Sequence, residues 1–185
     1  MDRGDDKRPL ANGRSDPFER TGLDVKVAQE ADLPVVIDIL AEAAAWIKDK
    51  GIDQWPSPPN EFWRERVAYM VERGEMFTVG VVKNRFAIVR ITTANHHWPD
   101  DNLALYVGLL AVRSNMHGQG LGAHILTWAA RKAQREGKRF LRLDCLAGNA
   151  RLRQYYEDQG FIYRGQFTSG EYVGAMYETL LPGAH

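Results

Sequence analysis

The residues best placed by type and spacing to do chemistry are the glycines of His117-Gly-Gln-Gly-Leu-Gly122. They follow the apolar run Ala104–Val112, which is typical of a buried strand, and they open into Leu121–Glu136, which has helical spacing. A helix N-terminus presents backbone N–H groups and partial positive charge, and glycine lets an anion approach that backbone. The combination predicts a phosphate site, and therefore a phosphorylated cofactor.

Two other known glycine patterns fit this loop less well. A P-loop requires Lys and then Ser or Thr after its last glycine, whereas Ala123 follows Gly122. A dinucleotide fingerprint, Gly-x-Gly-x-x-Gly, matches Gly118 and Gly120 but not position 123, although Asp144 lies at about the distance where such sites place an acid. A dinucleotide-dependent enzyme and a turn that only reverses the chain therefore remain alternatives.

A second group of candidate residues lies one helix and one strand further along. Arg139–Cys145 alternates like a strand, and Asn149, Tyr156 and Gly160-Phe161 follow it. An asparagine at the start of a helix can cap it through its side chain. A tyrosine, with a pKa near about 10, can act as a general acid toward a thiolate whose conjugate acid lies near about 8.5.

In this order, the glycine loop and the segment 149–161 resemble motifs A and B of the GNAT superfamily of N-acetyltransferases. The resemblance is specific over residues 75–165 and looser over 23–181, where it rests on the order of elements. It implies that the loop grips the pyrophosphate of acetyl-CoA, with His117 standing where the family usually has arginine or glutamine. It also implies acetyl transfer to a primary amine by direct attack on the thioester.

The resemblance assigns roles to positions of this sequence. Cofactor binding is expected of Leu109, Leu110, Val112, His117, Gly118, Gln119, Gly120, Leu121, Gly122 and Asn149. Tyr156 matches the general acid that protonates the leaving thiolate. Gly108 marks an expected bulge or close backbone approach in the long strand, and a backbone N–H near Leu109 or Leu110 could polarise the thioester carbonyl.

The general base cannot be read from the sequence. Many relatives supply a glutamate on the strand before the glycine loop, but Leu103–Val107 holds none. Asp101, Tyr106, His96 and His97 are near by sequence, and a chain of water molecules is an equal alternative. The adjacent histidines lack the spacing of a metal site, and no His-Glu-x-x-His pattern occurs, so no metal is assigned.

Other reactive or aromatic residues have plain structural interpretations. Cys145 could form an acyl-enzyme, but it ends a buried strand, which favours packing. Trp46, Gln54, Trp55 and Trp63 lie where the resemblance places the acceptor pocket. The acceptor is expected to be a small-molecule or peptide amine, and the sequence does not choose between them.

The elements that must position these residues follow from hydrophobic periodicity. The expected strands are residues 23–27, 76–82, 85–93, 104–112, 139–145, 162–167 and 172–181. The expected helices are one capped by Asp32 and ended by Gly51, one over 60–72, one over 121–136, and one starting at Asn149. The order β-α-α-β-β-β-α-β-α-β-β is similar to the GNAT acyl-CoA N-acyltransferase fold, an α/β (mixed α+β) architecture with a mixed central sheet flanked by helices.

Composition bounds the class of protein. Residues 1–22 are polar and rich in Gly and Pro, so a disordered tail is expected before a single domain over 23–185. A net charge of zero gives no support for a nucleic-acid or membrane partner. One cysteine, with neither a signal peptide nor a long apolar run, favours a cytoplasmic protein. A homodimer is a family expectation, and a non-catalytic acyl-CoA-binding or sensing domain is the alternative function.

Overall fold

The computed structural model describes residues 23–81, 84–99 and 101–183. The expected disordered tail, residues 1–22, lies outside them. The described chain divides into two compact units, and each is treated by itself. The N-terminal unit comprises residues 23–92 and 107–125, and the C-terminal unit comprises residues 93–106 and 126–183.

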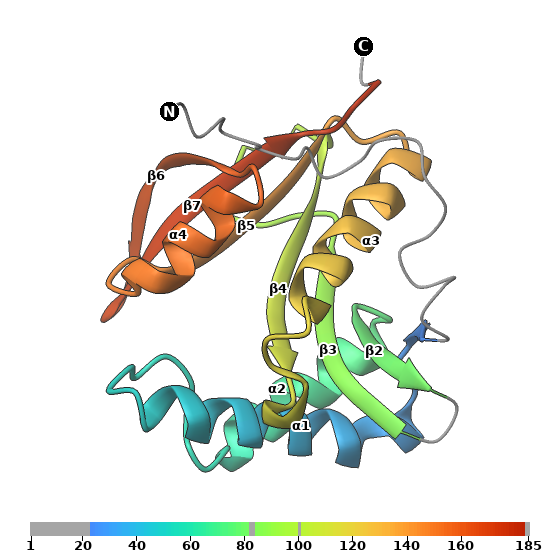
Figure 1. The fold of residues 1–185 in the computed structure, drawn as a ribbon, viewed down its shortest axis with the longest axis vertical. Coiled ribbons are helices and arrows are strands. Elements are labelled where there is room, and N and C mark those ends of the chain that lie inside the picture. The colour runs from blue at the N-terminus through green and yellow to red at the C-terminus, as the bar shows by residue number, and fades with distance from the viewer. Residues whose placement is uncertain (1–22, 82–83, 100, 184–185) are drawn as a thin grey trace, which may run out of the picture. The chain divides into compact units, whose positions relative to one another are not determined.

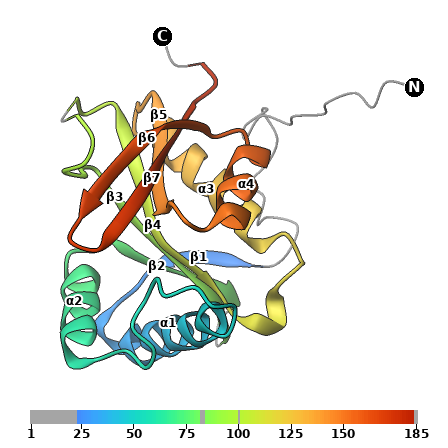
Figure 2. The same ribbon diagram turned by 90° about the vertical axis from the view of Figure 1, so that its left-hand side faces the viewer.

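The N-terminal unit is built on an antiparallel sheet with two helices (Figures 1 and 2). Its strands are β1 (Asp24–Val27), β2 (Met76–Val81), β3 (Asn84–Thr92) and the second part of β4 (Ala104–Val112). Its helices are α1 (Leu33–Lys48), α2 (Glu61–Glu72) and the first turn of α3 (Leu121–Arg135), with short 3-10 turns at Glu30–Asp32 and Ser114–Met116. The hairpin is confirmed, except that Asn84 belongs to β3 instead of the turn, and Lys83 lies outside the described residues.

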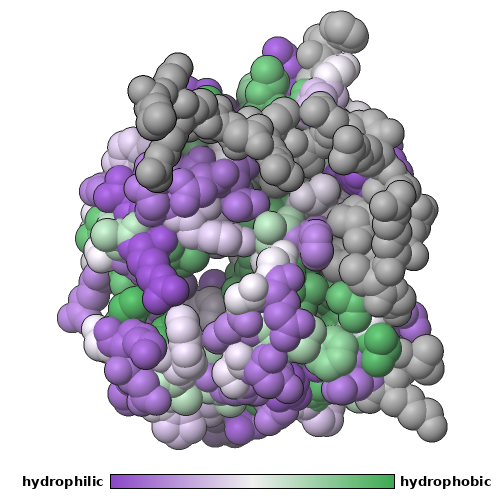
Figure 3. All heavy atoms as spheres, in the orientation of Figure 1, coloured by the Kyte–Doolittle hydropathy of each residue, from purple (hydrophilic) through white to green (hydrophobic). Residues whose placement is uncertain are grey.

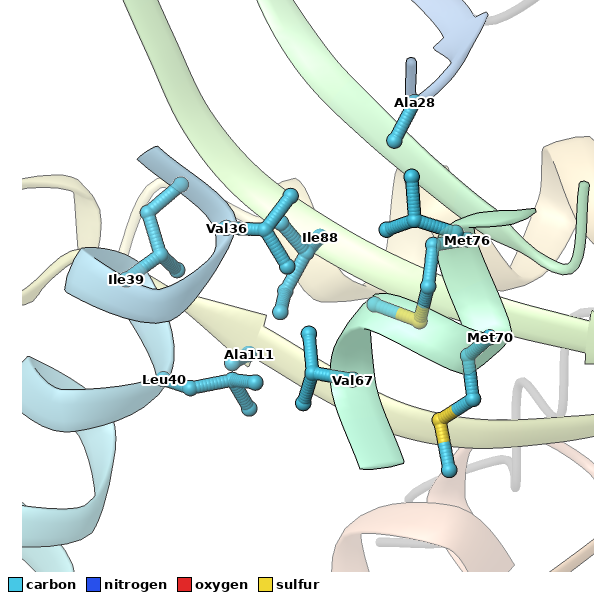
Figure 4. Packing of buried hydrophobic residues seen from close by; sticks show 10 residues of the cluster. Ala28, Val36, Ile39, Leu40, Val67, Met70, Met76, Ile88 and Ala111 are labelled. Carbon is cyan, nitrogen blue, oxygen red and sulfur yellow. The ribbon is translucent and has the colours of Figure 1, made fainter. Parts of the chain in front are cut away.

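Apolar stripes on α1 and α2 form the core of this unit (Figure 4). Val36, Ile39 and Leu40 are buried on α1, at the three- and four-residue spacing of one helix face. They join Val67, Met70 and Val71 of α2 and Ala28, Met76, Ile88 and Ala111 from the rest of the unit. The helices are therefore held by burial of one face each.

The ends of α1 and α2 are fixed by different polar groups. Asp32 does not cap α1 as expected, because its Oδ2 accepts the Gln29 N–H at 2.9 Å and closes the preceding 3-10 turn instead. Asn60 does cap α2, since its Oδ1 accepts the Trp63 N–H at 2.9 Å. Gly51 follows the end of α1 with φ +76°, a conformation that glycine adopts at little cost.

Strand β4 has the expected bounds, and its irregularity lies one residue after the glycine that was expected to mark it. The left-handed backbone torsion falls on Leu109, with φ +43°, and not on the glycine before it. A residue with a side chain pays about 1–2 kcal/mol for that conformation. Its side chain packs against the core of the N-terminal unit, which offsets the cost. Gly108 leaves open space, because a Cβ added there would meet no atom within 4 Å.

The C-terminal unit contains the start of β4 and three further strands. These are β5 (Phe140–Leu146), β6 (Ile162–Ser169) and β7 (Tyr172–Leu180), and β7 pairs antiparallel with both of the others. Helix α4 (Ala150–Asp158) lies against β5 and β7 (Figures 1 and 2), and the remainder of α3 also belongs to this unit. With β4 common to both units, the strands run in the order β1-β2-β3-β4-β5-β7-β6. The expected mixed sheet flanked by helices, with its element order, is confirmed.

A buried arginine ties together the polar face of the C-terminal unit. Arg142 is 5% exposed; its Nε donates to Glu178 at 2.7 Å, and its Nη2 donates to Asp101 at 2.9 Å. Its Nη1 also donates to the Tyr106 hydroxyl at 3.0 Å, and its guanidinium lies 4.8 Å from the Trp98 ring centre. A buried charge is tolerated when it is paired and hydrogen-bonded in this way.

One face of the molecule is mixed in polarity. Hydrophilic and hydrophobic residues are interspersed on the face shown in Figure 3. Within the described residues, every helix is too short or too polar to cross a membrane.

The conformation of Leu109 gives a stability prediction. Leu109→Ala and Leu109→Gly lose the same core contacts, but only glycine relieves the left-handed strain. We expect the glycine variant to be the more stable by about 0.5–1 kcal/mol in chemical denaturation. At Leu110, which lacks a positive φ, alanine should be the more stable of the pair. The same order at both positions would contradict this interpretation.

Candidate functional site

The glycine loop joins β4 to α3 with an open backbone. Gly118 and Gly120 have φ +76° and +72°, and a Cβ added to either would meet no atom within 4 Å. The His124 N–H bonds to the Gly120 carbonyl at 3.1 Å, which marks the first turn of α3. The N–H groups of a first helical turn point out of the helix and favour negative charge. The loop therefore has the conformation and the free space that an anion needs.

Polar side chains of the loop form hydrogen bonds with backbone carbonyl groups of the residues that precede it in the chain or begin it. His117 Nε2 lies 2.9 Å from the Val112 carbonyl, and its ring meets the Trp46 ring edge-on with centroids 4.8 Å apart. Gln119 Nε2 donates to the Asn115 carbonyl at 3.2 Å. These contacts shape the loop, so His117 is engaged in holding its conformation.

A carboxylate of α1 anchors the segment that leads into the loop. Glu42 Oε1 accepts the Ser114 N–H at 2.6 Å and the Ser114 hydroxyl at 2.5 Å, while its Oε2 accepts from Arg113 Nη1 at 2.8 Å. Arg113 also pairs with Asp38 at 2.5 Å. The hydrogen bonds from Ser114, more than the Arg113 charge, hold the pKa of Glu42 below its usual value. Sequence reasoning missed Glu42, because its partners lie more than 70 residues away.

The cofactor-binding residues expected from the sequence divide between the units. Those within 109–122 all belong to the N-terminal unit and follow one another from β4 through the loop into α3. Leu109, Leu110 and Val112 are half-buried, whereas 117–120 are exposed. Asn149 and Tyr156 belong to α4 of the C-terminal unit.

The two α4 residues have distinct surroundings. Asn149 Oδ1 accepts the Leu152 N–H at 3.1 Å, so this side chain caps the helix. Tyr156 is 7% exposed and packs against Tyr155, Phe161 and Tyr177, with ring centroids 5.5–6.2 Å apart. Burial raises the pKa of Tyr156, which keeps the proton on its hydroxyl at neutral pH.

Cys145 lies on the same side of β5 as the neighbouring buried leucines. It is 2% exposed, and burial, with a smaller effect of the nearby Asp144 charge, raises the pKa of its thiol to about 12. A thiolate is the nucleophilic form of cysteine, so a thiol held protonated is suited to packing.

Two of the candidate bases are already engaged. Asp101 accepts from Arg142 with both oxygens, at 3.0 and 2.9 Å, and these bonds hold its pKa below the usual value. The Tyr106 hydroxyl accepts from the same guanidinium. Such contacts favour a structural role for both residues.

The other two candidates, His96 and His97, lie near an acid that sequence reasoning did not propose as a base. Asp144 on β5 accepts from the Tyr172 hydroxyl at 3.2 Å, with the Asn95 amide at 3.5 Å. Burial raises the pKa of Asp144 above its usual value. Alternation along β5 places Asp144 on a different side of the strand from Cys145. This alternation is the one feature of the sequence that indicates different surroundings for the two residues.

Two of the expected acceptor-pocket aromatics share a pocket in the N-terminal unit. Trp55 and Trp63 line it together with Ile37, Leu40, Ala44, Pro56, Pro59, Arg64 and Val67. Trp46 instead contacts His117. Among the residues with described positions, no three or more His, Cys, Asp or Glu side chains gather as metal ligands would.

Comparisons with known proteins agree with this architecture. Residues 40–161 match the model of the acetyltransferase (GNAT) family. An uncharacterized N-acetyltransferase of Bacillus subtilis (strain 168), YesJ, is 28% identical over 149 residues, which cover 77% of this chain and 83% of that protein.

Solved structures share the fold. A GNAT-family acetyltransferase from Listeria monocytogenes superposes with a TM-score of 0.70 at 23% identity, covering 86% of this chain and 95% of that one. The YncA protein from Salmonella typhimurium, solved with its cofactor acetyl-CoA, has a TM-score of 0.62 at 14% identity, covering 88% and 95%. The family model spans well over half of the sequence, and the chain belongs to the GNAT family of acetyltransferases.

Proposed function

We propose that this protein is an acetyl-CoA-dependent N-acetyltransferase that moves an acetyl group to a primary amine of a small molecule or peptide in the cytoplasm. The open, left-handed glycines at the start of α3 carry the proposal, because they leave room for a pyrophosphate against the backbone. A structural neighbour solved with acetyl-CoA supports this choice of donor.

Acetyl-CoA would supply the activated acetyl group, and the chain's own residues would hold it. The backbone of 117–122 fits the pyrophosphate. The half-buried residues Leu109, Leu110 and Val112 suit the pantetheine arm, beside the space that Gly108 leaves open. The turned backbone at Leu109 would aim an N–H at the thioester carbonyl oxygen and stabilise its developing charge. Asn149 would contact the cofactor while capping α4.

Tyr156 would complete the reaction as the proton donor. When the amine attacks the thioester directly, the C–S bond breaks and the sulfur leaves as a thiolate. The Tyr156 hydroxyl, protonated at neutral pH, would supply the proton for that sulfur and regain one from solvent. Ring contacts with Phe161 and Tyr177 fix the position of the Tyr156 side chain.

The most direct functional test offers acetyl-CoA and a panel of primary amines to the purified protein and measures free coenzyme A. Release that depends on an amine supports the transferase. Stabilisation by acetyl-CoA with no release for any amine would favour the non-catalytic acyl-CoA-binding domain. Thermal stabilisation by NAD and none by acetyl-CoA would favour the dinucleotide alternative.

The glycine loop gives a binding prediction with an internal control. Gly120→Ala and Gly137→Ala each place a side chain at a left-handed position, φ +72° and +69°, in open space. Only Gly120→Ala should weaken acetyl-CoA binding, by at least about tenfold, because its methyl group would hold the pyrophosphate away from the backbone N–H groups. The loss of one charge-assisted hydrogen bond costs about 1.5–3 kcal/mol. Calorimetric titration measures this, and equal affinities in the two variants would refute the assignment.

The anchoring carboxylate gives a stability prediction. Glu42→Ala should lower the free energy of unfolding by about 1–3 kcal/mol and weaken acetyl-CoA binding, because Ser114 loses both of its contacts with Glu42. Asp38→Ala, whose side chain is 65% exposed, should change stability by less than about 0.5 kcal/mol.

The same contact has a defined pH dependence. The pKa of Glu42 is lowered in the folded state, so its contribution is present above the unfolded value of about 4.3 and is lost as pH falls below it. Denaturation at several pH values should therefore show the gap between wild type and Glu42→Ala narrowing at acid pH. A constant gap would contradict the proposed cause.

The acid role of Tyr156 is tested by Tyr156→Phe. We expect turnover to fall at least about tenfold while acetyl-CoA affinity barely changes, as for the loss of an acid catalyst. Tyr155→Phe, on the same helix, serves as the control and should keep its turnover. Unchanged turnover in Tyr156→Phe would contradict the proposed role of Tyr156 as general acid.

A further inference from the structure

Three carboxylates of the C-terminal unit differ in the groups that donate hydrogen bonds to them. Asp101 and Glu178 both pair with Arg142. Asp144 accepts instead from neutral donors, the Tyr172 hydroxyl at 3.2 Å and the Asn95 amide at 3.5 Å. Within the described part of the chain, Asp144 forms no ion pair with Lys or Arg. A half-buried carboxylate without a Lys or Arg partner has capacity for a further cation.

Aromatic rings lie beside this carboxylate. His97 stacks on Phe167 with centroids 3.5 Å apart and planes 14° apart, and Phe167 lies 5.9 Å from the Tyr172 ring. The His97 N–H also bonds to Asn95 Oδ1 at 3.0 Å, so the amide that reaches Asp144 is itself fixed. These rings come from the 93–99 segment, β6 and β7, and all belong to the C-terminal unit.

The rings of His97, Phe167 and Tyr172 form an aromatic wall, and the position of Phe167 in it depends on a glycine. A Cβ added to Gly174 would lie 2.3 Å from the Phe167 ring, so the ring occupies the space that the missing side chain leaves. Gly174 pairs with Leu146 across β5 and β7, two residues along from the pair formed by Asp144 and Met176. Residues two apart in a strand face the same side. Phe167 and Asp144 thus belong to one side of the sheet.

We propose that Asp144, with the rings of Phe167, His97 and Tyr172, binds the acceptor as a primary amine carried on a flat apolar group, and that Asp144 takes one of its protons. The inference rests on the proposed function. One carboxylate suits one ammonium group, and rings suit both a cation and an aromatic body. The structure thereby narrows the acceptor class to monoamines with an aromatic or similar apolar group.

The proton balance is simple. An alkylammonium with a pKa near about 10 arrives charged and cannot attack until it is neutral. One N–H bond breaks, an O–H bond forms on Asp144, and the freed lone pair on nitrogen attacks the acetyl carbonyl carbon. The amide product retains one N–H bond, so a second proton also leaves the nitrogen. Of the two protons that leave the nitrogen, one is released to solvent. The other is offset by the proton that the leaving thiolate takes up.

The groups that surround Asp144 set its pH response. His96 and His97 from the preceding segment lower its pKa, as do the hydrogen bonds from Tyr172 and Asn95, while burial raises it and outweighs them. Cys145, next to it in β5, stays protonated. A carboxylate with a raised pKa holds a proton more readily than an exposed one, which suits a base that must accept it from an ammonium group.

The test is calorimetric titration of 2-phenylethylamine and its neutral isostere 2-phenylethanol into protein saturated with coenzyme A at neutral pH. Wild type should bind the amine at least about tenfold more tightly than the alcohol. Asp144→Asn should abolish that preference and lower amine turnover. Glu171→Gln, which removes a charge from an exposed neighbour of Tyr172, should leave the preference intact.

A second variant tests the aromatic wall. Gly174→Ala displaces Phe167 and should weaken both ligands alike. Equal binding of amine and alcohol to wild type, or a preference that survives in Asp144→Asn, overturns the inference while the proposed function stands. Failure of coenzyme A to bind in the saturating step overturns the proposed function and this inference with it.

Discussion

The glycine loop depends on one carboxylate, Glu42 of α1. It holds the backbone N–H and the hydroxyl of Ser114 and the guanidinium of Arg113, the residues through which the chain leaves β4. With that departure fixed, the loop can enter α3 through two left-handed glycines and keep its backbone exposed. The core beneath α1 holds the anchor itself in place, since Val36, Ile39 and Leu40 bury the opposite face of the same helix. The proposed site for a phosphorylated donor thus rests on ordinary helix packing.

The C-terminal unit separates two kinds of acid on one side of its sheet. Arg142 neutralises Asp101 and Glu178, and those contacts serve structure. Asp144 is left with neutral donors and aromatic neighbours, and burial raises its pKa. On the other side of β5, burial raises the pKa values of Cys145 and Tyr156. Differences in desolvation and in charge partners therefore shift the pKa values of residues of similar chemistry by different amounts.

Local sequence signals predicted much of the fold. The bounds of β4 follow from its continuous apolar run, and the order of elements follows from periodicity and turn residues. The glycine loop was also readable, because positive φ values at Gly118 and Gly120 are what glycine permits. The irregularity of β4 was expected at Gly108 and lies at Leu109, because packing from outside the strand holds Leu109 in its left-handed conformation.

Contacts between distant segments could not be predicted either. Glu42 meets Ser114 across 72 residues, and Asn95 reaches Asp144 across 49. Such pairs depend on strand register and on how a helix crosses a sheet, which no local pattern specifies. Asp32 shows the same limit at short range, because two overlapping turns compete for one carboxylate and the earlier turn takes it.

We propose that the backbone of the glycine loop binds coenzyme A. Titration of ¹⁵N-labelled protein with coenzyme A, followed by amide NMR spectra, tests it most directly. If the loop binds the cofactor, the amide signals of Gly118, Gly120 and Gly122 should shift most and saturate together. Saturating shifts elsewhere, with these three glycine signals unmoved, would contradict it.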